Sequence, residues 1–175
     1  MFISKVRPSG VEHIMRPGDV IISKTDLRGA ITYCNDIFVE YSGFTESQLY
    51  GSPHSLVRHP EMPRAVFFLL WRELQAGREI FAYVKNLAAD GRHYWVFAQV
   101  LPELAEGVKV GYFSFRRCPS RRGVTTMEAL YAKMRAEEEK LGGNNGMQAS
   151  FTMLMDAVKA TGRTYEELLF ELQGA

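Results

Sequence analysis

A cation, an imidazole and a carboxylate lie within one four-residue stretch, as Arg58, His59 and Glu61. Pro60 within this stretch and Pro63 shortly after it restrict the backbone. Charged groups close to an apolar core cost folding free energy unless they meet partners. The local sequence allows an exposed ion pair between Arg58 and Glu61, which would contribute little, and a role for His59 in ordering the loop.

Two asparagines and a tryptophan are further candidates for contacts with a ligand. Asn86 shares the strand parity of apolar Ala82 and Val84, and a buried amide needs a hydrogen-bond partner, which favours a ligand contact. Asn35 offers the same donor and acceptor, but it also stands where a helix N-cap is expected. Trp71 continues an apolar helical stripe, so it either flanks a ligand or packs in the core.

The composition is that of an ordinary globular protein, with 175 residues, 46% of them hydrophobic and 23% charged, and a formal net charge of +1. A nucleic-acid partner is not expected, since such proteins carry a clustered basic face. We interpret the basic run at 116–117 and 121–122 as the solvated exit of a strand, and only in second place as a docking patch. The longest apolar run, 65–71, is far shorter than the ~20 residues of a membrane helix. We therefore expect a cytoplasmic protein without membrane insertion.

Hydrophobic spacing and turn residues predict an α+β fold with a five-stranded antiparallel sheet, carrying short helices and one longer helix on one face. The expected strands are 19–27, 30–33, 80–87, 92–104 and 108–116. Short helices are expected after Asn35 and after Thr45, and the longer helix is expected from Pro63 to Gly77. We divide the chain into an N-terminal cap at 1–18, a central domain at 19–118 and a C-terminal helical extension at 119–175.

The last three predicted strands are apolar on both faces, whereas antiparallel sheets usually leave one face polar. Tyr94 and Val96 point to one face, and Trp95 and Phe97 point to the other. The N-terminal segment, a C-terminal helix or a second copy of the chain must therefore cover the outer face. Apolar residues recur at helical spacing over 125–141, interrupted by three glutamates at 137–139. This pattern predicts either a helix docked on the sheet or a short coiled coil between two copies.

The rest of the C-terminal extension has two helical stripes and a glycine-rich connection. Residues 142–146 are predicted to form a flexible linker. Short helices are predicted at 151–159 and 165–172, and their apolar stripes face each other or a partner.

The order of elements and several sequence strings resemble a known family. The strings are Ser42-Gly43-Phe44-Thr45, Val57-Arg58-His59-Pro60-Glu61-Met62-Pro63, Val84-Lys85-Asn86 and His93-Tyr94-Trp95-Val96. In this order and at this separation they are similar to the PAS domain of bacterial aerotaxis receptors, over roughly residues 19–117. Two positions depart from the family pattern, which usually has Asp at Glu61 and Trp at Phe81. The first change keeps the charge, and the second alters a ring that can stack near a cofactor.

The resemblance implies a sensor and not an enzyme, with FAD bound non-covalently and used to report redox state or oxygen level. Flavin-supporting residues carry over to the matching positions Asn35, Arg58, His59, Glu61, Asn86 and Tyr94, and Trp71 is a further candidate. The resemblance implies that Arg58 holds the FAD pyrophosphate, because a planar guanidinium matches phosphate oxygens, and that His59 either hydrogen-bonds the dinucleotide or orders the loop. Haem b is the alternative cofactor, with His59 as its axial ligand, because some PAS relatives of this type are haem proteins. A cofactor-free interaction or dimerisation module is a further alternative.

The resemblance also bears on partners. The family's membrane segment and methyl-accepting domain do not occur in this sequence, so we expect signalling by contact with another protein. The expected partners are a second copy of the chain, bound through the outer sheet face or the C-terminal helices, and a signalling protein such as a kinase or a chemoreceptor.

Overall fold

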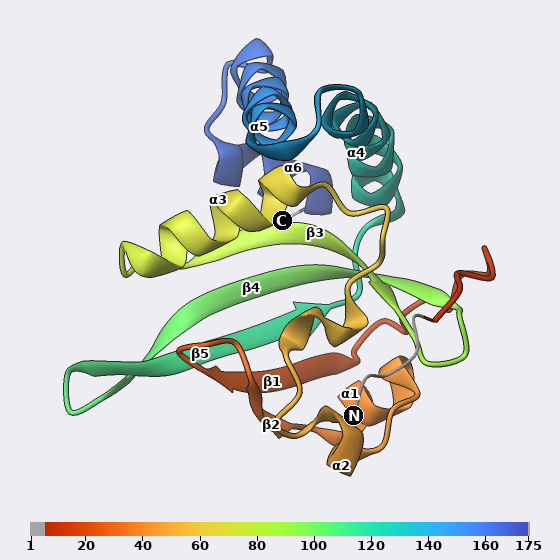
Figure 1. Cartoon of the computed structure of the whole chain (residues 1–175), viewed down its shortest axis with the longest axis vertical. Coiled ribbons are helices and arrows are strands. Elements are labelled where there is room, and N and C mark those ends of the chain that lie inside the picture. Colours follow the sequence, from red (N-terminus) through yellow and green to blue (C-terminus); the bar gives the residue numbers. More distant parts are fainter. Residues whose placement is uncertain (1–5, 175) are drawn as a thin grey trace.

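The computed structural model describes residues 6–174 and has a five-stranded antiparallel sheet at its centre (Figure 1). The strands are β1 (Val20–Asp26), β2 (Ile31–Cys34), β3 (Ile80–Leu87), β4 (His93–Ala105) and β5 (Val108–Arg117). Their order is β2-β1-β5-β4-β3, so that the first strand pairs with the last in the middle of the sheet. The predicted α+β fold with five antiparallel strands is confirmed.

Helices occupy the β2–β3 connection and the whole C-terminal region. The connection contains α1 (Asp36–Ser42), α2 (Glu46–Leu49), the 3-10 helix η1 (His54–Val57) and α3 (Arg64–Gln75). The C-terminal region contains α4 (Arg121–Leu141), α5 (Gly143–Ala160) and α6 (Tyr165–Gln173).

Local sequence signals explain where the short helices begin and end. The Asn35 side chain caps α1 by accepting a hydrogen bond from a first-turn N–H at 3.1 Å, and Gly43 ends that helix with a φ of +67°. Thr45 and Gln48 form the expected capping box of α2. α3 differs from both, because Pro63 precedes it and offers no side-chain cap. A distant residue must therefore satisfy the first N–H groups of α3.

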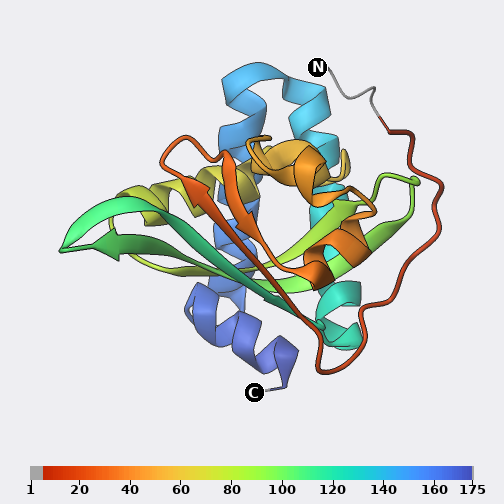
Figure 2. The ribbon, with the colours of Figure 1, turned by 90° about the horizontal axis from the view of Figure 1, so that it is seen from below.

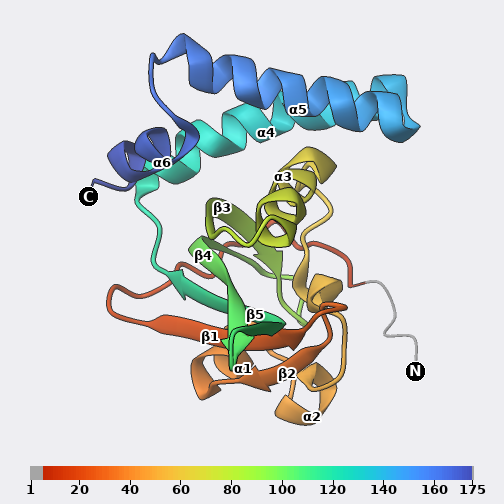
Figure 3. The same ribbon diagram turned by 90° about the vertical axis from the view of Figure 1, so that its left-hand side faces the viewer.

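The two faces of the sheet pack against different helices. We call inner the face that carries Val84 and Ser114, which α3 and η1 cover, and outer the opposite face. On the outer face, Trp95 of β4 stacks on Tyr131 of α4, with 6.3 Å between ring centroids. Figure 3 shows α4 and α5 crossing above the sheet, with α3 beneath α5. Because α5 rests on α3 and α4 rests on β3, this helix pair spans both sides of the β3 edge.

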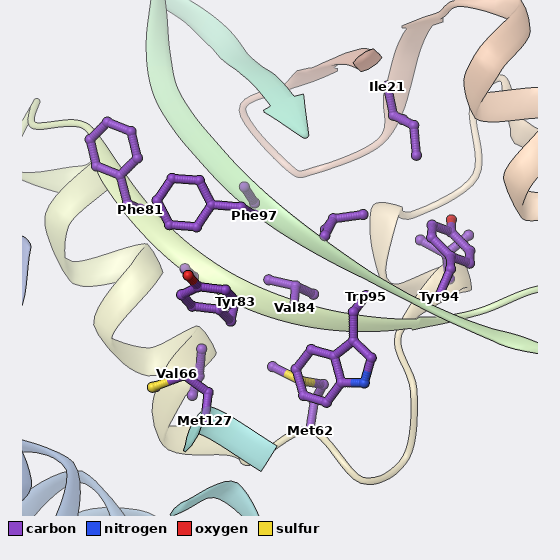
Figure 4. Packing of buried hydrophobic residues seen from close by; sticks show 14 of the residues in the cluster. Ile21, Met62, Val66, Phe81, Tyr83, Val84, Tyr94, Trp95, Phe97 and Met127 are labelled. Carbon is purple, nitrogen blue, oxygen red and sulfur yellow. The ribbon is translucent and has the colours of Figure 1, made fainter. Parts of the chain in front are cut away.

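The aromatic packing beneath α6 is dense. Phe81 of β3 and Phe97 of β4 lie side by side, with ring centroids 5.8 Å apart (Figure 4). The Phe170 ring of α6 meets Phe81 edge-on at 4.7 Å. The phenylalanine at position 81 is thus part of the outer-face core, and the chain's own C-terminal helix buries it.

Gly123 lets α4 approach the sheet closely. A Cβ atom at this position would lie 2.1 Å from the Tyr83 hydroxyl oxygen of β3, so that only glycine fits. One turn further along α4, Met127 is 1% exposed, and Tyr131 donates a hydrogen bond to the Tyr83 carbonyl at 3.0 Å. The helix is therefore docked on the outer face, as the first of the two sequence alternatives predicts.

The predicted flexible linker at 142–146 is wrong. Gly142 makes the turn with a φ of +66°, and α5 begins at the next residue. A Cβ at Gly146 would lie 2.7 Å from the Glu138 carbonyl oxygen. The glycines of this stretch therefore allow a tight turn and close contact between α4 and α5.

The N-terminal segment lies along the β3–β4 turn (Figure 2). The His13 N–H donates to the His93 carbonyl at 2.7 Å, and the His93 N–H donates to the Val11 carbonyl at 2.9 Å. The part of the predicted cap at residues 1–5 falls outside the described residues. Over residues 6–174, none of the helices combines the length and the apolar character needed to cross a membrane.

Candidate functional site

A cavity of about 280 Å³ lies between the inner face of the sheet, α3 and η1. Its lining residues are Ser23, Thr25, Arg28, Gly29, Pro53, His54, Ser55, Arg58, Phe67, Leu70, Trp71, Leu74, Val84, Asn86, Ala98, Val100, Tyr112, Ser114 and Arg116. Ligand sites usually measure roughly 300–1,000 Å³, so this volume is near the lower end. The cavity is large enough for the ring system of a ligand, whereas the rest of a larger molecule would extend through the mouth.

Aromatic rings from α3 and β5 form one wall of the cavity. Trp71 meets Tyr112 edge-on, with ring centroids 5.2 Å apart and an interplanar angle of 81°. The other side of the indole faces the β1–β2 turn, where a Cβ at Gly29 would lie 3.6 Å from the ring. Gly29 has a φ of +85°, which favours glycine independently of the space available. The turn and the indole are therefore fitted to each other at the cavity wall.

Two exposed arginines lie where the cavity opens to solvent. Arg28 comes from the β1–β2 turn, and Arg58 follows η1. The Arg58 guanidinium lies over the Phe67 ring at 3.6 Å from its centroid, which holds the charge above α3. The backbone of Arg58 also forms an isolated antiparallel bridge with Asn86 of β3. The mouth thus carries positive charge from two separate segments.

Asn86 is the buried polar residue on the β3 side of the cavity. It is 4% exposed, and its Nδ2 is buried without a hydrogen-bond partner in the described part of the chain. A buried amide donor left unpaired costs roughly 1–3 kcal/mol. A ligand with an acceptor at this position would remove that cost.

Ser23 connects two further polar residues of the cavity wall. Its hydroxyl accepts a hydrogen bond from Arg116 Nη2 at 2.5 Å and lies 3.1 Å from His54 Nε2. Burial, reinforced by the nearby Arg116 charge, lowers the pKa of His54 to about 3. The imidazole is therefore neutral at physiological pH, and its Nε2 is able to accept the serine proton.

Residues 31–114 match a family model described as the PAS fold. A segment of 116 residues, 66% of the chain, is 41% identical to the aerotaxis receptor of Escherichia coli (strain K12), of which it covers 23%. This chain contains a PAS domain of the aerotaxis receptor type. The nitrogen fixation regulatory protein of Klebsiella pneumoniae is 28% identical over 127 residues, which cover 67% of the chain and 26% of that protein. The chain spans about a quarter of the length of these curated relatives.

Solved structures share the PAS fold. A light-oxygen-voltage domain studied with a flavin analogue has a TM-score of 0.52 at 20% identity, covering 69% of this chain and 85% of that one. The dark structure of the blue-light photoreceptor Aureochrome1 LOV has a TM-score of 0.51 at 21% identity, covering 68% and 85%. At this level of identity the likeness concerns the fold.

Three of the seven residues predicted from the sequence line the cavity of the PAS domain: Arg58, Trp71 and Asn86. Asn35 lies elsewhere, and its amide is already used, since it caps α1, accepts from the Ile22 N–H at 3.0 Å and donates to the Val20 carbonyl at 2.8 Å. Its position matches the helix-cap alternative.

His59, Glu61 and Tyr94 are not among the lining residues. His59 is 2% exposed, its Nδ1 accepts the Glu61 N–H at 3.1 Å, and burial lowers its pKa to about 4. Glu61 forms a 2.5 Å ion pair with Lys85, whose hydrogen bond lowers the pKa of the carboxyl group. Tyr94 pairs with Asn86 across β3 and β4 and is fully buried; its hydroxyl has no partner in the described part of the chain, and burial raises its pKa.

Glu61 lies on the far side of β3 from the cavity, because Lys85 points to the outer face. Lys85 also contacts Glu128 of α4 at 3.2 Å, and Arg135 of α4 donates to the Pro60 carbonyl. The loop at 58–63, which we call the RHPEMP loop, therefore contacts β3 beside the cavity and α4 on the outer face.

Sequence reasoning missed three basic residues of the cavity: Arg28, His54 and Arg116. The interpretation of the basic run as a solvated strand exit is wrong at Arg116, which is 2% exposed. Strand parity contained the signal, since Arg116 shares its strand face with Tyr112 and Ser114, which both line the cavity.

Proposed function

We propose that this PAS domain binds FAD non-covalently in the cavity and reports its redox state through contacts with another protein in the cytoplasm. The observation that carries the proposal is the buried Nδ2 of Asn86, which has no partner among residues 6–174, on a cavity walled by Trp71 and Tyr112. A flavin ring is planar and has acceptor atoms along its polar edge, which suits aromatic walls and a buried amide donor. When bound, the flavin would supply reversible electron uptake.

The arrangement at the mouth supports a dinucleotide as the ligand. Arg28 and Arg58 would hold the phosphates outside the small cavity, since guanidinium groups bind phosphate oxygens in a planar, bidentate manner. The resemblance to the aerotaxis receptor, which is 41% identical over 116 residues, implies FAD and so supports the same choice.

Haem fits the cavity less well than a flavin. An axial ligand would have to come from the cavity wall, where His54 is the histidine that lines it, and Ser23 already engages its Nε2. His59, the ligand expected for haem, is not among the lining residues, and its Nδ1 holds the backbone of the RHPEMP loop.

The RHPEMP loop is the proposed route from cofactor to output. It bridges to Asn86 at Arg58, and it contacts α4 at Pro60 and, through Lys85, at Glu61. A change in the hydrogen bonds of Asn86 would shift the loop and alter how the C-terminal helices sit. A redox signal results only if the oxidised and the reduced cofactor favour different arrangements of these helices. The receiving protein would be a kinase, a chemoreceptor or a second copy of the chain.

Reconstitution with FAD tests the proposal. Purified protein incubated with FAD and then desalted is expected to keep the absorption bands of an oxidised flavin, and Asn86→Leu is expected to lose most of them. Asn144→Leu, an exposed position on α5, is the matched control and should load like the parent. A Soret band in the protein as purified would favour haem. A well-folded parent protein that retains neither cofactor would contradict the proposal and favour a cofactor-free interaction module.

A further inference from the structure

Arg116 is a buried cation on the inner face of the PAS domain. It is 2% exposed and lines the cavity, whereas its chain neighbour Arg117 points to the opposite face and is exposed. Successive residues of a strand point to opposite faces, so that one arginine of the pair is placed in the core and the other in solvent.

The Arg116 guanidinium is only partly satisfied. Nη2 donates to Ser23, while Nε and Nη1 are buried without a hydrogen-bond partner within residues 6–174. The group lies over the Phe38 ring, 4.2 Å from its centroid, which offsets part of the desolvation. Burial lowers its pKa to about 10, so that the charge remains at neutral pH. A buried charge with two unpaired donors costs folding free energy that an apolar side chain of similar size would not.

The rest of the cavity wall does not balance this charge. Over the described residues, no aspartate or glutamate lines the cavity, and the arginines of the mouth add to the positive potential. Of the polar side chains on the wall, Ser23 already accepts from Nη2 and His54 is neutral. The unpaired donors of Asn86 and Arg116 therefore call for a ligand with acceptor atoms and negative charge.

We propose that Arg116, which lines a cavity without acidic residues and has two unpaired nitrogens within residues 6–174, is the residue that favours the reduced, negatively charged state of the bound flavin. The proposal rests on the flavin of the proposed function. Reduction of the neutral oxidised ring by two electrons and one proton leaves one negative charge on it. A fixed cation in a site of low dielectric stabilises that charge more than it stabilises the neutral ring, which raises the midpoint potential.

The stability of the flavin-free protein distinguishes a ligand-binding role of Arg116 from a purely structural one. If the guanidinium served to hold the fold, its replacement by an apolar chain of similar length would destabilise the protein without flavin. If it serves the ligand, the same replacement removes two buried unpaired donors and leaves the flavin-free protein at least as stable as the parent.

The experiment compares Arg116→Met, Arg116→Lys and the control Arg117→Met in the full chain. Dithionite, which is oxidised to sulfite, supplies the electrons for a reductive titration against indicator dyes. We expect a lower midpoint potential in Arg116→Met, a smaller decrease in Arg116→Lys and no change in Arg117→Met. Urea unfolding of the flavin-free proteins is expected to show no loss of stability in Arg116→Met. Where the methionine variant does not retain flavin, Arg116→Gln supplies the comparison with Arg116→Lys.

The outcomes separate this inference from the proposed function. If the parent protein takes up no flavin, both are wrong. If the parent and the variants bind flavin with equal midpoint potentials, the role of Arg116 is wrong and the flavin function stands. A methionine variant that is destabilised without flavin and unchanged in potential would assign Arg116 to the fold.

Discussion

The carboxylate of Glu138 accepts a hydrogen bond from the backbone N–H of Ala65 at 3.1 Å. It also accepts from the Arg64 N–H at 3.0 Å, and it is 6% exposed. Helix α3 begins after Pro63, which offers no side-chain cap, and Glu138 of the distant helix α4 caps it instead. The negative charge also faces the positive end of the α3 dipole.

Replacing this distant cap should destabilise the whole domain. Glu138→Ala leaves the buried Ala65 N–H and the partly buried Arg64 N–H without their acceptor, and it is expected to lower the free energy of unfolding by roughly 1–3 kcal/mol. Urea unfolding followed by circular dichroism measures the change. Glu139→Ala removes an exposed ion pair with Arg135 on the same helix and is expected to change stability by less than ~0.5 kcal/mol. Equal effects of the two variants would contradict the assigned role.

Adding one methyl group at Gly123 should weaken the docking of α4. In Gly123→Ala the new Cβ would overlap the Tyr83 hydroxyl, and overpacking of this kind typically costs about 1–3 kcal/mol. Hydrogen exchange is expected to accelerate in α4 and α6 more than in β1 and β5. Thr126→Ala, an exposed change on the same helix, serves as the control. Unchanged exchange in Gly123→Ala would mean that α4 adjusts without leaving the sheet.

Two histidines with lowered pKa values should make stability depend on pH. The folded state lowers the pKa of His54 to about 3 and that of His59 to about 4, from 6.5 in the unfolded chain. Below about pH 6.5 the unfolded chain binds protons that the folded state does not, so the free energy of unfolding falls as the pH is lowered towards 4, by up to ~1.4 kcal/mol per pH unit for each histidine. Urea midpoints measured between about pH 7 and about pH 5 test this. His59→Gln should flatten the profile, and an unchanged slope would be inconsistent with a neutral buried imidazole.

The arginines of the cavity mouth should distinguish phosphate-bearing flavins from riboflavin. Arg28→Ala and Arg58→Ala are each expected to weaken FAD binding about tenfold, equivalent to ~1.4 kcal/mol, and to leave riboflavin affinity nearly unchanged. FAD affinity of the parent should also fall as salt is added, because both cations are exposed. Fluorescence titration measures each constant, with Arg92→Ala on the β3–β4 turn as the control. Equal losses for FAD and riboflavin would place the arginines against the ring and not the phosphates.

Local patterns in the sequence predicted the sheet and the short helices, because alternation, capping residues and glycine turns act over a few neighbours. They also identified Asn86, since its strand parity is a local property. Glu138 was not identified, because helical periodicity alone does not reveal that a glutamate from a run of three caps α3. Arg116 was missed for a related reason: a basic run was interpreted as one block, although successive strand residues point to opposite faces. Such positions depend on which distant elements pack together.

The two tryptophans lie on opposite faces of the sheet. Trp71 lines the cavity, and Trp95 is buried beneath α4. The protein thus contains two intrinsic fluorophores, one on each side of β4. In single-tryptophan variants, quenching of Trp71 would report on ligand entry, and the emission of Trp95 would report on departure of the C-terminal helices. Parallel stopped-flow experiments on the two variants would give the order in time of these two events without an added label.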